Sequence, residues 1–79
     1  YPNPFNPVSV IKYDVPKTAF VKISIFDILG REVKILVNEQ KQPGYYQIQF
    51  DGSNFASGVY FYRIISGDYN QTKRMVLVK

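Results

Sequence analysis

The sequence predicts an all-β domain, an antiparallel β-sandwich of about six or seven strands. Runs of alternating apolar and polar residues recur along the 79 residues, with Gly, Pro, Asn and Asp between them. That spacing is typical of an antiparallel sandwich. No segment sustains the 3.6-residue apolar period that an amphipathic helix requires. A chain of this length builds one domain with one modest core.

The first half of the chain contains three expected strands. Residues 8–15 and 20–27 alternate between apolar and polar side chains, and residues 32–37 form a third run. Every second side chain of a strand faces the same side. Residues 28–31 are expected to form a turn, because Gly30 can adopt a positive φ. The expected inward side chains are Ile11, Tyr13, Val15, Val21, Ile23 and Ile25, and the expected outward ones are Lys12, Asp14, Lys22 and Ser24.

The second half begins with the longest polar stretch, residues 38–44, whose Pro-Gly pair predicts a mobile loop. Residues 46–51 then alternate, and residues 58–66 are apolar on both faces, which favours a central strand. The Gly67-Asp68 pair predicts a tight hairpin, so residues 71–78 should lie antiparallel to the preceding strand. The expected inward side chains here are Tyr46, Ile48, Phe50, Tyr60, Tyr62 and Ile64.

Composition argues against an enzyme. The chain has no Cys and no His, so it lacks the thiolate, the usual general base and the commonest metal ligand. Its six Asp and Glu residues are scattered, and a small sandwich leaves little room for the cleft that paired carboxylates need. We therefore expect no catalytic residues and no cofactor. With seven Tyr and six Phe, the chain has the material for an ordered aromatic core.

Other binding chemistries find little support. Residues 51–54 fail the spacing of a calcium loop and are better explained as a turn that bonds its own backbone. The net charge of +4 suits anionic surfaces. In the run at residues 58–66, however, only Phe61 beside Arg63 resembles a base-stacking site, so we expect no binding of nucleic acid. No apolar run is long enough to span a membrane. Because the chain begins with Tyr1 instead of Met, we expect a piece of a longer protein.

The segment before the first strand is rich in proline. Pro2, Pro4 and Pro7 each lack a backbone donor, so residues 1–7 should run extended across one end of the sandwich formed by residues 8–79, with Phe5 as the anchor. A proline-rich recognition peptide is the alternative.

Four pieces of the chain together resemble the type A C-terminal sorting domain of type IX secretion cargo, a family of immunoglobulin-like sandwich tails of Gram-negative surface and secreted proteins. The pieces are residues 1–5, 27–33, 51–60 and 73–79. The resemblance that they carry spans essentially the whole chain. One departure is Phe55, where the family commonly has Leu. The resemblance implies a single immunoglobulin-like antiparallel β-sandwich that serves as an address and not as a catalyst.

The resemblance also implies partners and places. The domain would be read in the periplasm by an outer-membrane translocon and a shuttle protein, and a sortase would remove it as the cargo is secreted or attached to the cell surface. The cargo domain would precede Tyr1. The implied recognition residues are Lys73, Arg74, Val76 and Lys79 in the tail and Gly30 and Val33 in the middle motif, with Pro2, Asn3, Pro4 and Phe5 marking the start.

The last run, residues 73–79, suggests how reading could work. A strand near a chain end presents or frays to an open edge, to which a receptor could add a strand while the flanking cations select an acidic partner. The rival interpretation is a structural immunoglobulin-like spacer of a secreted hydrolase, or a domain like that of flagellar hook-capping proteins. A spacer would tolerate Lys79→Ala, whereas a sorting signal would not.

Overall fold

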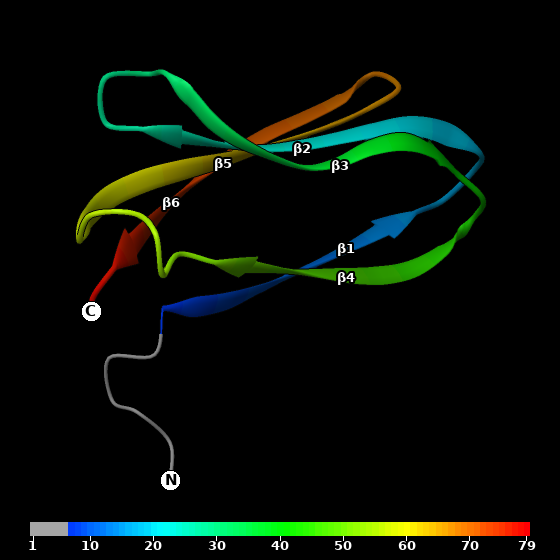
Figure 1. Ribbon diagram of the computed structural model, residues 1–79. Coiled ribbons are helices and arrows are strands. Elements are labelled where there is room, and N and C mark those ends of the chain that lie inside the picture. The colour runs from blue at the N-terminus through cyan, green and yellow to red at the C-terminus, as the bar shows by residue number, and fades with distance from the viewer. Residues whose placement is uncertain (1–6) are drawn as a thin grey trace, which may run out of the picture.

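The computed structural model describes residues 7–79 as a two-layer β-sandwich (Figure 1). The two-layer arrangement follows from the alternation of apolar and polar residues, since each strand has one apolar face to bury. Within the described residues there are six strands and no helix. The strands are β1 (Val8–Val15), β2 (Ala19–Asp27), β3 (Glu32–Lys41), β4 (Gly44–Asp51), β5 (Gly58–Ser66) and β6 (Tyr69–Leu77).

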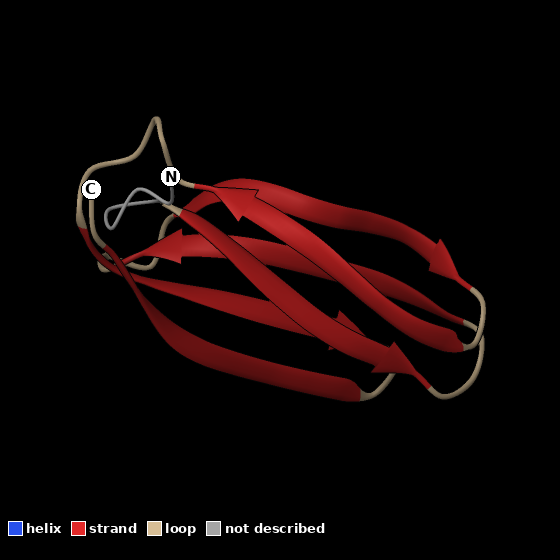
Figure 2. Cartoon of the chain, turned by 90° about the horizontal axis from the view of Figure 1, so that it is seen from below, coloured by secondary structure: helices blue, strands red, loops and turns tan. Residues whose placement is uncertain are grey.

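The two layers are unequal. One sheet has four antiparallel strands in the order β3-β2-β5-β6, and the other has only β1 and β4. Two hairpins, β2–β3 and β5–β6, stay within the larger sheet, while the remaining connections cross between the layers. Seen from the side of β1 and β4, the small sheet covers only part of the larger one (Figure 2). The prediction of an immunoglobulin-like, all-β sandwich is confirmed.

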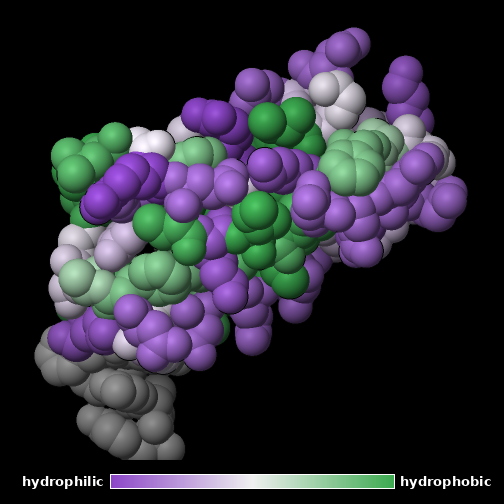
Figure 3. Space-filling model, turned by 45° about the horizontal axis from the view of Figure 1, so that its top comes forward, coloured by the Kyte–Doolittle hydropathy of each residue, from purple (hydrophilic) through white to green (hydrophobic). Residues whose placement is uncertain are grey.

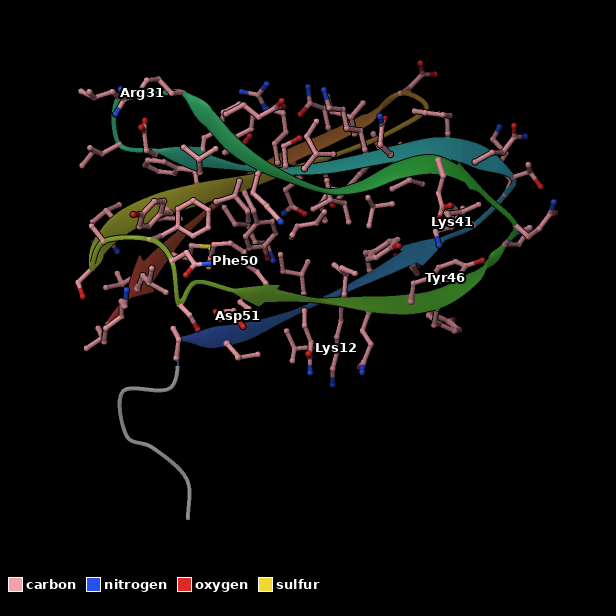
Figure 4. The ribbon with its side chains drawn as sticks, in the orientation of Figure 1. Lys12, Arg31, Lys41, Tyr46, Phe50 and Asp51 are labelled. Carbon is pink, nitrogen blue, oxygen red and sulfur yellow. The ribbon has the colours of Figure 1, made fainter. Side chains whose placement is uncertain are left out.

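The core lies between the layers and is built by alternate side chains of every strand. Phe50 is the largest fully buried side chain, and Figure 4 shows it between the two sheets. At roughly 25 cal/mol per Å² of apolar surface removed from water, such side chains supply the main stabilising term. The buried apolar residues are Ile11, Val15, Val21, Ile23, Ile25, Val37, Phe50, Tyr60, Ile64 and Leu77.

One predicted outward side chain is buried. Ser24 is 3% exposed, although it alternates with the inward Ile23 and Ile25. The prediction that Ser24 faces solvent is therefore wrong. Because β2 is an inner strand, Ser24 lies between two larger residues that pair with it across the sheet, Ile35 of β3 and Arg63 of β5.

The expected mobile loop at residues 38–44 is also wrong. Asn38, Glu39 and Gln40 continue β3 and pair with β2, and only residues 42–43 separate β3 from β4. The stretch is polar because β3 is an edge strand of the large sheet, and polar side chains protect such an edge from pairing with other chains. The polar composition of this stretch therefore reflects the exposure of an edge strand to solvent and does not indicate an irregular backbone.

The expectation for the strongest apolar run is confirmed, since β5 lies between β2 and β6. Its outer face is covered in part by side chains. The Arg63 guanidinium carbon lies 4.7 Å from the centre of the Phe26 ring, and Arg63 Nε donates to the Thr72 hydroxyl at 3.4 Å. This arrangement shields apolar atoms that would otherwise face water.

The outer surface carries separate apolar patches among hydrophilic side chains (Figure 3). Exposed large apolar residues include Ile35 at 45% and Val76 at 53%. In the part of the chain that the structure describes, no helix has the length and apolar character to cross a membrane.

The sandwich closes where β6 ends against the residue after β4. Gly52 is buried, and a Cβ atom there would lie 2.5 Å from Leu77 Cδ1. Leu77 itself is 2% exposed. Glycine at position 52 is therefore what allows Leu77 into the core.

We expect Gly52→Ala to destabilise the domain by about 1–3 kcal/mol, because the added methyl must push Leu77 out of its place. Chemical denaturation monitored by tyrosine fluorescence would measure the loss. Gly44→Ala is the matched control, since its Cβ would make only ordinary contacts of 3.6 Å with Tyr46. It should change stability by no more than about 0.5 kcal/mol. Equal effects of the two substitutions would contradict the packing argument.

Candidate recognition surface

Three of the four sequence motifs meet at one end of the sandwich. The β2–β3 turn, the β4–β5 connection and the end of β6 all lie at the left of Figure 1, beside the start of β1. The strand register brings the same motifs together, because Asp27 pairs with Tyr60 and Tyr60 pairs with Met75. We call this surface the motif end, made of residues 28–30, 52–57 and 78–79.

The β2–β3 turn is built by Asp27. Its Oδ1 accepts hydrogen bonds from the backbone N–H groups of Leu29, at 2.9 Å, and Arg31, at 3.0 Å. Its Oδ2 forms an ion pair with Arg31 Nε at 2.7 Å. The Gly30 N–H donates to the Asp27 carbonyl, and Gly30 has a φ of 84°. Residues 28–31 therefore form a turn with Gly30 in the left-handed region, as the sequence predicted.

Two carboxyl groups hold turns at this end, and the pKa of each lies below its ordinary value. The backbone N–H of Arg31 is the main cause that lowers the pKa of Asp27. The hydroxyl and then the backbone N–H of Ser53 lower the pKa of Asp51. Each carboxylate therefore supports its turn above the ordinary carboxyl pKa, and that support is lost as the pH falls through the lowered pKa of the folded state.

The tip of the turn presents two large apolar side chains to solvent. Ile28 is 66% exposed and Leu29 is 75% exposed, while their backbone is fixed by the Asp27 bonds. The two residues that the resemblance implies for recognition in this motif, Gly30 and Val33, do not present large exposed side chains. Gly30 offers no side chain and serves the turn geometry, and Val33 is half-buried against the core.

The β4–β5 connection, residues 52–57, is fixed from within. The Phe55 N–H donates to the Gly52 carbonyl at 2.9 Å. The Tyr60 hydroxyl donates to the Ala56 carbonyl at 2.7 Å, much like the tyrosine corner of immunoglobulin-like domains. The Phe55 ring lies 6.2 Å from that of Tyr60, edge to face. The β4–β5 connection is therefore held in a defined conformation by its own contacts.

The tail folds onto this connection. Lys79 Nζ donates to the backbone carbonyls of Ser53, at 2.6 Å, and Phe55, at 2.8 Å. The Lys79 N–H donates to Ser57 Oγ at 3.3 Å. The Lys79 ammonium group thus binds backbone carbonyls of the domain itself. The sequence had suggested that it helps to select an acidic partner.

The other implied tail residues do not share one face. Lys73 lies on the face of β6 that turns toward the small sheet, in line with Met75 and Leu77. Arg74 and Val76 lie on the outer face and are exposed. A partner on the outer face would therefore meet Arg74 and Val76 but not Lys73.

The proline-rich start, Pro2, Asn3, Pro4 and Phe5, lies outside the described residues, so its implied role stays a prediction. The described residues contain no group of three His, Cys, Asp or Glu that could hold a metal ion. Sequence reasoning missed Ile28 and Leu29. The available signal was two large apolar residues inside an Asp-x-x-Gly turn, where polar residues are the rule.

We expect Asp27→Ala to loosen the β2–β3 turn, because the N–H groups of Leu29 and Arg31 lose their acceptor. Amide hydrogen exchange followed by NMR should become faster at these positions. Glu32→Ala is the control, since Glu32 makes only an exposed ion pair with Lys22 at 3.4 Å. Unchanged exchange at Leu29 in the Asp27 variant would contradict the assignment.

Comparison with known proteins agrees with the arrangement of the motifs. Searches of the curated proteins and of the solved structures found no match. The family model described as a secretion system C-terminal sorting domain matches residues 1–79. The match covers all four motifs, and the chain therefore belongs to the family of secretion system C-terminal sorting domains.

Proposed function

We propose that the motif end is the surface that the secretion machinery reads. A domain of this family is the C-terminal sorting signal of type IX secretion, and it directs export of its cargo across the outer membrane to the cell surface or the medium. The alternative, a structural spacer or a hook-capping-like domain, is not favoured. What remains to be assigned is which residues of the chain make contact.

The observation that carries the proposal is the convergence of three motifs on one end. Residues 27–33, 51–60 and 73–79 lie far apart in the sequence, yet hydrogen bonds and strand register join them there. A spacer needs no such gathering. A signal read in the folded state needs one surface of fixed shape, because preorganised groups lose less entropy on binding.

Within this surface we assign direct contact to Ile28 and Leu29. A rigid turn that exposes two large apolar side chains is costly for a protein that only needs to stay soluble, and such side chains are typical anchors for a partner's pocket. Asp27 and Gly30 then act by positioning the tip. Lys79 acts by positioning the connection at residues 52–57.

The partners follow from the family. We propose an outer-membrane translocon and a shuttle protein as the readers, and a sortase as the enzyme that acts on the domain after its transit through the periplasm. The domain itself is proposed to be non-catalytic. Residues 8–79 are proposed to be the sandwich and residues 1–7 its lead-in from the cargo.

We expect substitution of the tip to reduce export while the fold persists. The experiment fuses residues 1–79 to the C-terminus of a periplasmic reporter in a bacterium with a type IX system. Ile28→Ser with Leu29→Ser should lower the exported fraction by about tenfold or more, as loss of an apolar anchor does. Phe20→Ser is the matched control, because Phe20 is 56% exposed at the start of β2, away from the motif end. Normal export of the folded tip variant would contradict the assignment.

A second variant tests the role of Lys79. Lys79→Met keeps most of the aliphatic stem but removes the donors to the Ser53 and Phe55 carbonyls. We expect faster amide exchange in residues 52–57 and reduced export of the same reporter. Lys34→Met, an exposed cation of β3, should change neither. Loosened exchange with normal export would show that the shape of the connection is not read.

A further inference from the structure

The unequal sheets leave a groove that the motif end does not include. Because the small sheet has only two strands against four, part of the inward face of β5 and β6 has no strand above it. A groove of about 450 Å³ lies there, between β1 and the β5–β6 hairpin. It reaches Pro16 after β1 and Gly67 in the β5–β6 turn, so it extends to the end of the sandwich opposite the motif end.

One wall of the groove is a strand edge. In the described sheets β1 pairs with β4 along one side only, and three β1 residues, Lys12, Tyr13 and Asp14, line the groove. A strand edge carries backbone N–H and C=O groups that can pair with an added strand. The next strand position lies about 4.8 Å from β1, which places it over the uncovered part of the large sheet.

The floor of the groove is apolar where an added strand would need it. Ile64 and Tyr62 of β5 and Ala19 of β2 line it. Ile64 is 7% exposed, and Tyr62 is half-buried. Side chains of an extended peptide alternate, so every second one would face this floor.

The rim of the groove carries a small excess of positive charge. Three lysines line it against two aspartates, Asp14 and Asp68, a difference of 3 − 2 = +1. The ion pairs formed by residues 7–79 are Lys22–Glu32, Arg31–Asp27 and Lys41–Glu39, so the rim lysines have no carboxylate partner among these residues. Figure 4 shows one of them, Lys12, pointing away from the layer above. The rim lysines are Lys12, Lys17 and Lys73.

We infer that this groove binds an extended acidic segment of another protein, which pairs with the edge of β1 at residues 12–14 and adds a third strand to the small sheet. Alternate apolar side chains of the segment face Tyr62 and Ile64, and the carboxylates between them face outward, on the side to which Lys12 points. A second copy of this chain fits less well, because its Lys and Arg residues outnumber its Asp and Glu residues by 10 to 6. The inference goes beyond the sorting function and does not depend on it.

The test uses a synthetic peptide of about six residues in which Val and Glu alternate. Titrated into the 79-residue domain, it should shift the NMR signals of Lys12, Asp14 and Gln71, which lie around the groove, and leave those of β3 unchanged. The same peptide with Lys in place of Glu should bind at least about tenfold more weakly. A version methylated on alternate backbone nitrogens should lose binding, because it cannot pair with a strand edge.

Matched variants locate the site. Lys12→Glu should weaken binding of the acidic peptide by about tenfold, and Lys34→Glu, the same charge change on β3, should leave it nearly unchanged at physiological salt. Binding that ignores N-methylation, that responds equally to both variants, or that is absent at millimolar peptide would overturn the inference. So would sedimentation of the domain as a dimer through β1. Reporter export is measured separately and does not enter this result.

Discussion

The structure depends on one crossing, the passage of the chain from the small sheet to the large one through residues 52–57. At this point the absence of a side chain on Gly52 lets Leu77 reach the core, and the backbone carbonyls of Ser53 and Phe55 bind the Lys79 ammonium group. Two layers and the tail are thus joined within a few residues. Any change that moves this crossing alters the closure of the core and the shape of the motif end at once.

The motif residues divide into those that stabilise the fold and those whose side chains are exposed to solvent. Asp27, Gly30 and Val33 have structural duties, since they set the turn and fill the core. Ile28 and Leu29 have no comparable duty, and they stand in solvent. A family signature can therefore mark residues whose contribution to recognition is indirect. The side chains that we assign to contact sit between the marked positions.

Alternation made most of the fold predictable. It gave the inward faces of β1, β2, β4 and β5, and a Gly-Asp pair gave the β5–β6 hairpin. It failed for Ser24, because burial on the second face of an inner strand depends on neighbours that come from other strands. It failed for residues 38–44, because an exposed edge strand and a loop have the same polar composition. The Lys79 contacts were beyond prediction, since their acceptors are backbone carbonyls, which every residue has.

The pairing of β1 with β4 also joins two segments that lie far apart in the sequence. Val8 pairs with Asp51 and Val15 with Gly44, so β1 has no partner strand until the chain has been made beyond the β2–β3 hairpin. The two hairpins of the large sheet close short loops, so we expect them to form before β1 pairs with its distant partner. During synthesis the apolar face of β1, with Ile11 and Val15, is therefore open to other proteins. A chaperone that holds extended apolar segments would find such a segment in β1.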